Sequence, residues 1–469
     1  AWVAIVRPGG LDLPFFWDEA DVYVPGSVWV ADHGLTVTPG VFPDDYSRGH
    51  PPLLYLIAGA AFAVFGASPT VGHLVVAPFT IAALVGTYLT GATLFDRRAG
   101  AAAALLLGVT PLFMSMGNML LPEMPLTALA VLSFLALARG RLGGWVALGI
   151  AASCMKETGI FAAAGVGAAV LFDAQRRGTL RSTAGVARVG LATAPLAVLG
   201  LFFAWQRATA GYFVFPHHAN LFAERPFSWS DLLTVFPSLF AWHGRFIVML
   251  AALPAAAVAL RRTSTPVEAD EQPWAPRRSA VMVGAAVVVF ANAAFFAKMF
   301  WLERYALPAH PLVLVAACGA LFALVTPERR RLSHALPWAP IFAAVMFGAL
   351  SMWAPPEADA EEQTFAYADV IATHRAALSA IEGSDPYVLT TWPMSIEARY
   401  PYLGYVARPI DALNVRYLAD QEDAPITHVL VSTASPSANA LREEARRRGM
   451  RRLSTHRVGG ARALELWGR

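Results

Sequence analysis

Two adjacent carboxylates, Asp18 and Glu19, follow Trp17 near the start of a chain that is mostly apolar. Carboxylates at the mouth of a transmembrane bundle are costly unless water, a partner or a substrate meets them. In such a place a carboxylate can accept a proton or hold a cation. The pair therefore predicts a functional site, and its position relative to the membrane decides what that site can do.

The residues around the pair also have structural explanations. Asp18 is of a type that caps a helix N-terminus, and Glu19 either orients Asp18, holds a cation or is a solvated carboxylate of a first helical turn. Glu123 stands between prolines in an otherwise apolar hairpin, where it either joins the acidic pair or faces water. If Asp18 and Glu123 bind a divalent cation, their oxygen ligands suit magnesium, manganese or calcium. No organic cofactor is expected.

Two basic residues, Lys156 and Arg304, are candidates for binding a phosphate. Lys156 interrupts an apolar stretch beside Glu157, so it is either half of a local ion pair or a phosphate ligand. Arg304, followed by Tyr305, is either a phosphate ligand or an arginine that snorkels from a helix end. A leaving phosphate gains most from cations in a water-poor site.

Histidines and aromatic residues are the remaining candidates. His50 can hydrogen-bond a phosphate or an acceptor near neutral pH, although a lone interfacial histidine is more often a structural donor. The segment 211–224 carries aromatic residues that either stack on a sugar or anchor the chain among lipid headgroups, and anchoring is the commoner role. His217 and His218 are neighbours without a convincing third ligand, so a zinc site is not expected.

The composition indicates a polytopic membrane protein. Of 469 residues, 56% are hydrophobic and only 15% are charged, and the mean hydropathy is +0.49. A formal net charge of +3 with dispersed arginines argues against a nucleic-acid partner. Cys154 and Cys318 both fall in apolar runs and are expected to be small buried hydrophobes.

Apolar runs recur along the chain at bilayer-compatible lengths. They cover 73–94, 99–117, 125–138, 187–205, 236–260, 279–297, 306–325 and 335–353, with two shorter runs at 144–155 and 159–172. If each run crosses once, the arginine clusters between them all fall on one side, which the positive-inside rule makes cytoplasmic. The stretches 7–72, 122–123, 156–157, 206–235 and 298–305 then lie together on the outer side.

The first outer stretch, 7–72, is predicted to be one large loop. Its apolar run 53–65 is short for a span and suits a helix lying at the interface, with Pro51 and Pro52 at its start. The short run 1–6 is expected to be the stump of a truncated first helix. We thus predict a mainly α transmembrane bundle with about 10 or 11 spans in residues 1–353.

The composition changes after Trp353, and residues 354–469 are predicted to form a small soluble α/β domain on the outer side. Short buried strands are expected at 387–391 and 428–432, and a helix at 438–448 that ends at Gly449. The domain either covers the active site, grips an acceptor or is a structural cap.

Five motifs stand in an order that resembles the lipid-dependent glycosyltransferases of fold type C (GT-C). They are Trp17-Asp18-Glu19, Gly49-His50-Pro51-Pro52-Leu53, Pro122-Glu123-Met124-Pro125-Leu126, Met155-Lys156-Glu157-Thr158-Gly159 and Glu303-Arg304-Tyr305-Ala306-Leu307-Pro308. The match looks like the superfamily of the protein O-mannosyltransferases and the aminoarabinose transferases, glycosyltransferase families 39 and 83, and covers residues 1 to about 353.

The resemblance implies roles for these residues. Asp18 with Glu19 would be catalytic and Glu123 the second acidic motif, while Lys156, Arg304, Tyr305 and His50 would bind the donor phosphate. His50 agrees with the mannosyltransferase branch and departs from the lysine of the aminoarabinose transferases. The Arg-Tyr that follows the acidic pair in the family is replaced by Ala20-Asp21-Val22-Tyr23, so contacts of that motif are not carried over.

The expected function is transfer of a sugar, with inversion, from a polyprenyl-phosphate donor to an acceptor on the extracytoplasmic face. The acceptor is a glycan, a lipid or a protein, the bilayer is a partner, and the bacterial inner membrane is the expected location. The alternative is a secondary transporter or lipid-linked-sugar flippase without transferase activity. The one-sided cluster of acids argues against that alternative, because a transporter more naturally scatters ionisable residues through its helices.

Overall fold

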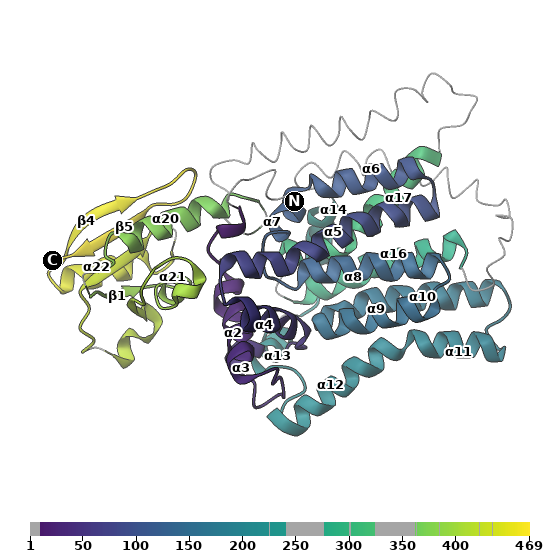
Figure 1. Cartoon of the computed structure of the whole chain (residues 1–469), viewed down its shortest axis with the longest axis horizontal. Coiled ribbons are helices and arrows are strands. Elements are labelled where there is room, and N and C mark those ends of the chain that lie inside the picture. The colour runs from purple at the N-terminus through teal and green to yellow at the C-terminus, as the bar shows by residue number, and fades with distance from the viewer. Residues whose placement is uncertain are drawn as a thin grey trace, which may run out of the picture.

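The chain forms a helical bundle that carries a small α/β unit at one end (Figure 1). The computed structural model describes residues 10–224, 226–240, 276–299, 302–323, 362, 364–383, 385–421, 423–433 and 435–469. The predicted run 335–353 and most of the run 236–260 lie outside these residues, as do residues 1–6 and the predicted domain boundary at 353.

The bundle consists of antiparallel helices of unequal length. They are α5 (Pro69–Leu94), α6 (Arg97–Gly108), α7 (Pro111–Met116), α8 (Glu123–Ala138), α9 (Leu142–Met155), α10 (Ile160–Arg176), α11 (Thr183–Ala192), α12 (Ala194–Ala210), α16 (Arg278–Lys298) and α17 (His310–Ala323). Glycines allow two close helix contacts, Gly91 against Gly100 between α5 and α6, and Gly165 against Gly284 between α10 and α16. Small residues at helix crossings are typical of membrane bundles.

Among the described residues, four helical segments are long and apolar enough to cross a membrane. They are Pro69–Leu94, Glu157–Arg176, Arg278–Lys298 and Glu303–Phe322, and α11 with α12 forms a fifth if this pair, bent by 42°, is one span. The helices α8 and α9 are apolar but shorter. The chain is thus a multi-pass membrane protein, as predicted.

Prolines divide two of the predicted runs. The run 99–117 is two helices, α6 and α7, because Pro111 cannot donate the N–H that would continue the first. The run 187–205 is likewise divided next to Pro195. The outer stretch 206–235 contains the helices α13 (Pro216–Glu224) and α14 (Trp229–Phe240).

Basic residues gather at the end of the bundle that faces away from the sheet. Asp173, at the end of α10, forms an ion pair with Arg177 at 2.8 Å and accepts a hydrogen bond from the Arg277 backbone N–H at 3.1 Å. Arg278, at the start of α16, lies 5.0 Å from the ring of Phe95 at the end of α5. In Figure 1 these helix ends lie on the right, opposite the C-terminal unit. This grouping agrees with the predicted arginine pattern.

The N-terminal stretch, predicted as one outer loop, folds into short helices. These are η1 (Gly10–Asp12), a π-helical turn η2 (Glu19–Tyr23), α2 (Val24–His33), α3 (Asp44–Ser47) and α4 (Leu53–Phe65). The apolar run 53–65 is the helix α4, and it begins directly after Pro52 as expected. α2 packs on α4, where Gly26 leaves room for the Tyr55 ring.

The C-terminal unit contains a five-stranded sheet in the order β2-β1-β3-β5-β4. Its elements are α20 (Tyr367–Ser379), β1 (Tyr387–Thr390), α21 (Met394–Glu397), η7 (Pro401–Leu403), β2 (Asp411–Asn414), η8 (Val415–Asp420), β3 (His428–Ser432), α22 (Ala438–Arg447), β4 (Arg451–His456) and β5 (Leu464–Gly468). β1 pairs in parallel with β2 and β3, and β5 pairs antiparallel to β3 and β4.

The strands β1 and β3 and the helix α22 confirm the sequence predictions to within a residue. Gly449 follows α22 with φ +71°, a conformation that glycine adopts without strain. β2, β4 and β5 were not predicted. β2 has only four residues and β4 is largely exposed, so neither shows a clear apolar pattern.

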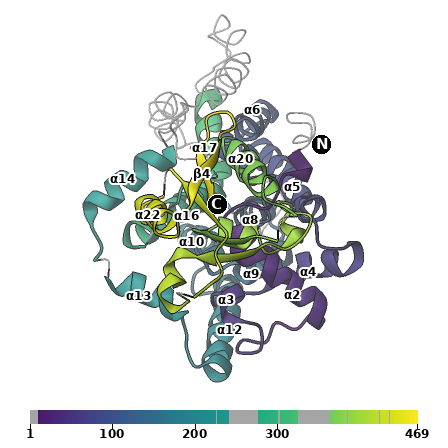
Figure 2. The same cartoon turned by 90° about the vertical axis from the view of Figure 1, so that its left-hand side faces the viewer.

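The C-terminal unit rests directly on the N-terminal helices, in front of the bundle in Figure 2. The Phe15 N–H donates to the carbonyl of Leu403 at 3.0 Å. The ring of Phe16 stacks on Tyr367 at 5.6 Å, and Trp17 meets Trp392 edge to face at 5.4 Å. The segment that carries Asp18 is therefore enclosed between the bundle and the C-terminal unit.

Candidate functional site

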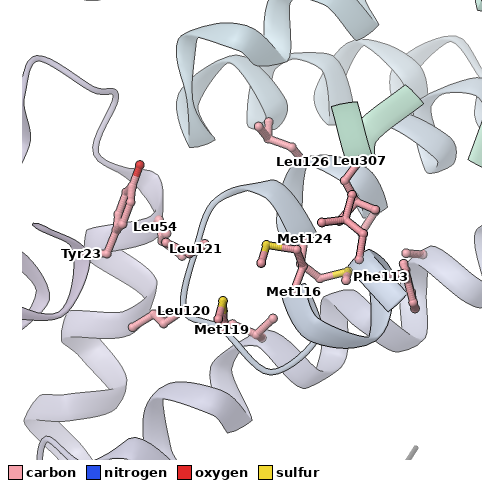
Figure 3. Close-up of a cluster of buried hydrophobic side chains, with 14 of the residues drawn as sticks. Tyr23, Leu54, Phe113, Met116, Met119, Leu120, Leu121, Met124, Leu126 and Leu307 are labelled. Atoms are coloured by element: carbon pink, nitrogen blue, oxygen red, sulfur yellow. The ribbon is translucent and has the colours of Figure 1, made fainter. Parts of the chain in front are cut away.

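The chain between α7 and α8 is buried under the acidic pair. Met119, Leu120 and Leu121 are at most 1% exposed and pack with Met116 and Met124 (Figure 3). This apolar anchoring holds the turn that places Glu123 at the first position of α8. The loop therefore presents fixed backbone groups to the N-terminal segment.

Glu19 uses both of its oxygens on backbone amides. Oε2 accepts from Phe16 N–H at 3.1 Å and Oε1 from Leu120 N–H at 2.6 Å. Oε1 also lies 3.8 Å from Nε2 of His73. Burial raises the pKa of Glu19 to about 8, against the opposing effect of the two amides. Glu19 thus joins the Asp18 segment to the loop before Glu123, and the interpretation as a solvated first-turn carboxylate was wrong.

Asp18 differs from Glu19 in that its side chain is accessible to solvent. Its side chain is 26% exposed and accepts a hydrogen bond from Arg304. The capping interpretation was wrong, because its side chain accepts no backbone N–H of η2. Burial alone would raise the pKa of Asp18, but the charge and hydrogen bond of Arg304 outweigh it and lower the pKa. Trp17, just before it, has a left-handed backbone with φ +51°, the kind of strain found at functional sites.

Arg304 is the centre of the charge network. Its side chain is 3% exposed, and its guanidinium donates to Asp18 and to Glu362. Its Nε lies 3.9 Å from Oε1 of Glu123. An arginine held among carboxylates inside the protein is not snorkelling, so that interpretation was wrong.

Glu362 was not singled out in the sequence. It is 3% exposed, and its backbone carbonyl accepts from the hydroxyl of Ser115 on α7. Burial raises the pKa of Glu362 to about 7, with Arg304 opposing. It stands in an acidic stretch after Trp353 that looks like a solvated linker. No local pattern distinguishes it, because its partner lies 58 residues earlier.

Lys156 pairs with Glu123, not with its neighbour Glu157. The Lys156 Nζ to Glu123 Oε1 distance is 2.9 Å, and both side chains are nearly buried. The ammonium also lies 4.6 Å from the centre of the half-buried Tyr305 ring. Burial opposes the charge of Lys156, but Glu123 raises its pKa overall. Glu123 does not face water, and the alternative of a local Lys156–Glu157 ion pair was wrong.

His50 extends the network on the side of α13. Its Nδ1 lies 2.9 Å from Oε2 of Glu157, and its ring stacks on Tyr23 at 6.4 Å. The ring of His218 is 5.3 Å away, and burial lowers the pKa of His218 to about 4. His217 is exposed at the surface. The structure therefore brings His50 to the site through Glu157.

The residues do not fit the divalent cation considered for Asp18 and Glu123. The guanidinium of Arg304 already lies between these two carboxylates, where the metal would have to sit. In the part of the chain that the structure describes, no group of three or more His, Cys, Asp or Glu side chains is placed to hold a metal. Cys154 and Cys318 are free thiols, and Cys318 is buried.

The structure thus brings together every residue singled out for the site. Asp18, Glu123, Lys156, Arg304 and Tyr305 form one cluster, with Glu19 below it and His50 beside it through Glu157. In the cluster, each buried cation faces a carboxylate. An anionic ligand that pairs with one of these cations would therefore exchange places with a carboxylate.

Comparison with known proteins bears on the fold of the chain. Residues 49–215 match the family model described as dolichyl-phosphate-mannose-protein mannosyltransferase. The crystal structure of ArnT from Cupriavidus metallidurans bound to undecaprenyl phosphate is similar, with a TM-score of 0.60 and 13% identity over 99% of this chain and 96% of that chain. The apo structure of the same protein gives 0.59 and 14% over 99% and 97%. No curated protein sequence matches. The chain therefore has the fold of ArnT, as the GT-C resemblance predicted.

Proposed function

We propose that the protein is an integral-membrane glycosyltransferase that moves a sugar from polyprenyl phosphate to an acceptor hydroxyl. The observation that carries the proposal is the contact between the partly exposed Asp18 and the buried Arg304. It joins a proton acceptor to a permanent cation at the end of the bundle opposite its basic loops.

The reaction follows from this pair. The acceptor oxygen attacks the anomeric carbon of the donor and forms the new glycosidic bond. The bond from that carbon to the phosphate oxygen breaks, and its electron pair remains on the phosphate. Asp18 takes the proton of the acceptor hydroxyl. A single displacement of this kind inverts the anomeric centre.

The leaving phosphate needs positive charge, and Arg304 and Lys156 supply it. The donor carries one negative charge, which we place beside the guanidinium in exchange for Glu362. Lys156 is held at 2.9 Å from Glu123 and under Tyr305, so it stays oriented during this exchange. We assign to His50 a supporting contact with the phosphate and to Glu19 the positioning of Asp18.

Similarity to known proteins supports the same proposal. The stretch that matches the mannosyltransferase family model includes His50, Glu123 and Lys156. A protein of the same fold is described as bound to undecaprenyl phosphate, which makes a polyprenyl phosphate a reasonable donor here. We also propose the bacterial inner membrane as the location, with residues 354–469 forming a separate domain on the outer side.

The test is a turnover assay with the purified protein and a panel of polyprenyl-phosphate sugars. We expect one sugar to be bound and polyprenyl phosphate to be released, and Asp18→Asn to abolish release without loss of binding. Asp45→Asn, an exposed aspartate in the same N-terminal stretch, is the matched control. Binding without release in wild-type protein would instead support a transporter or flippase, and absence of binding to every sugar would refute the proposal.

A further inference from the structure

Asp18 borders a second group of polar side chains that the proposed reaction does not use. Asp21 lies one turn further along, where its N–H donates to the carbonyl of Trp17 at 3.0 Å. Its carboxylate pairs with Arg48 at 2.5 Å. The two side chains are 21% and 33% exposed, so this ion pair is open to solvent, unlike the buried network around Arg304.

Aromatic rings surround this open ion pair. Trp392, from the segment after β1, lies beside the carboxylate of Asp21, where it opposes the rise that burial causes in the pKa of Asp21, and it remains 36% exposed. Its ring meets that of Trp17 edge to face at 5.4 Å. Both tryptophans therefore stand at the junction between the N-terminal helices and the C-terminal unit.

Three tyrosines also lie near the junction between the N-terminal helices and the C-terminal unit. Tyr400 and Tyr402 stack at 5.3 Å, and both are half-buried. Tyr46, two residues before Arg48, is close enough to Tyr400 to interact with it electrostatically. Arg48 itself has a left-handed backbone with φ +43°, which the helix end at α3 imposes. The segment that carries Arg48 thus lies close to the tyrosines of the C-terminal unit.

We propose that Trp17, Asp21, Arg48, Trp392 and Tyr400 form a subsite for a sugar ring of the acceptor, so that the acceptor is a glycan. The inference rests on the proposed transferase function and adds the acceptor class to it. We call these five residues the acceptor surface. The ion pair of the acceptor surface is partly exposed whereas Arg304 is buried, so we place the acceptor on the solvent side of Asp18 and the donor on its buried side.

The chemistry of the acceptor surface suits a carbohydrate. Ligand sites combine aromatic faces with a few placed polar groups, and the apolar face of a sugar ring can pack on an indole or phenol ring. A carboxylate accepts from one sugar hydroxyl while a guanidinium donates to the next. One recurring mode of peptide recognition uses backbone hydrogen bonds along a strand edge, whereas aromatic rings and an ion pair are gathered here.

The test uses the full-length protein with its donor and two readouts. Release of polyprenyl phosphate without acceptor reports donor cleavage by water, and product formation reports transfer. The acceptors are labelled cell-envelope oligosaccharides and serine- or threonine-containing peptides. The variants are Trp392→Ala, Trp392→Phe and Asp21→Asn, and Tyr417→Ala, an exposed aromatic on η8, is the control.

We expect an oligosaccharide to be glycosylated and Trp392→Ala to raise its KM between about threefold and tenfold. Donor KM and cleavage by water should stay within about twofold of wild type, since the acceptor surface does not touch Arg304 or Lys156. Trp392→Phe should recover part of the loss because it restores a ring face. Tyr417→Ala should match wild type.

Two outcomes would overturn the inference and leave the proposed function in place. One is transfer to peptides with no transfer to any oligosaccharide. The other is glycan transfer with an acceptor KM unchanged by Trp392→Ala and by Asp21→Asn, and Asp21→Asn decides the matter if Trp392→Ala does not fold. If no donor is cleaved even by water, the proposed function fails and the inference fails with it.

Discussion

The guanidinium of Arg304 donates a hydrogen bond to the carboxylate of Asp18 across 286 positions of sequence. The contact joins the N-terminal segment to the 3-10 helix Glu303–Ala309, which leads directly into α17. Because arginine stays charged at all physiological pH values, it keeps Asp18 ionised and lowers the pKa of that carboxylate. The proposed base is thereby ready to accept a proton.

Removing the charge of Asp18 is the most direct prediction. Asp18→Asn should lower transfer by about 10² to 10⁴-fold, because the amide keeps the shape but cannot take the acceptor proton. Donor KM should change little, since the variant leaves Arg304 and Lys156 in place. The measurement is polyprenyl-phosphate release at saturating donor. Turnover near the wild-type rate would remove Asp18 from the mechanism.

Lys156 and Glu123 should behave as a coupled pair. Lys156→Met leaves the carboxylate of Glu123 buried without its nearest cation, which should cost roughly 3–5 kcal/mol of unfolding free energy. Adding Glu123→Gln should restore most of that stability but not the donor affinity. Thermal unfolding of both single variants and the double variant measures the coupling, and donor KM separates stability from function. Strictly additive effects would show that the two residues do not interact.

Glu362 should compete with the donor for Arg304. Its pKa is raised to about 7 by burial, so it is neutral below that pH and charged above it. The donor phosphodiester keeps one charge throughout. Donor KM of the wild type should therefore rise as pH increases through 7, and Glu362→Gln should give a lower KM without that rise.

The exposed Glu443 on α22 is the control for Glu362. Glu443→Gln should keep the wild-type KM and its pH dependence. A Glu362→Gln enzyme with unchanged donor KM at pH 8 would mean that the donor does not displace this carboxylate.

Glu19 should make stability fall as pH rises. Burial raises its pKa from 4.5 to about 8, so the folded state holds a proton that the unfolded state releases between these values. Stability from this group is greatest at the acid end of the range and decreases toward pH 8. Glu19→Gln should flatten the dependence of Tm on pH between 5 and 8, whereas Glu224→Gln, an exposed control, should not. A slope equal to that of the wild type would contradict this role.

Cysteine labelling tests the proposed orientation. In a variant without Cys154 and Cys318, Asp45→Cys should react with a membrane-impermeant maleimide in intact spheroplasts. Arg181→Cys, at the basic end of the bundle, should react only after permeabilisation, and both side chains are exposed in the structure. The reverse pattern would invert the topology and place Asp18 in the cytoplasm.

Much of the fold was predictable because short segments of the sequence specify their own helices and strands. The run 53–65 became α4, 279–297 became α16 to within a residue at each end, and 428–432 became β3. These segments have continuous apolar patterns that specify burial by themselves. Where a proline interrupted the pattern, at Pro111 and Pro195, one expected helix became two.

The ion-pair and hydrogen-bond partners of the charged side chains could not be predicted from local sequence. Lys156 selected Glu123 over the adjacent Glu157, since a buried charge pairs with the group that the packing of α8 and α9 brings to it. Glu19 and Asp18 are neighbours, yet one is held by backbone amides below the surface and the other remains partly open. The sequence could mark both as unusual but could not assign their different roles.

By itself, the sequence determined the membrane bundle, the acidic and basic residues of the site other than Glu362, and the strands β1 and β3, because hydropathy and residue type act over short stretches. Only the tertiary structure decided that Arg304 joins Asp18 to Glu362 and that Trp392 lies beside Asp21. Those contacts join segments that are far apart in the chain, and no local pattern can specify which distant charge or ring will reach a given carboxylate.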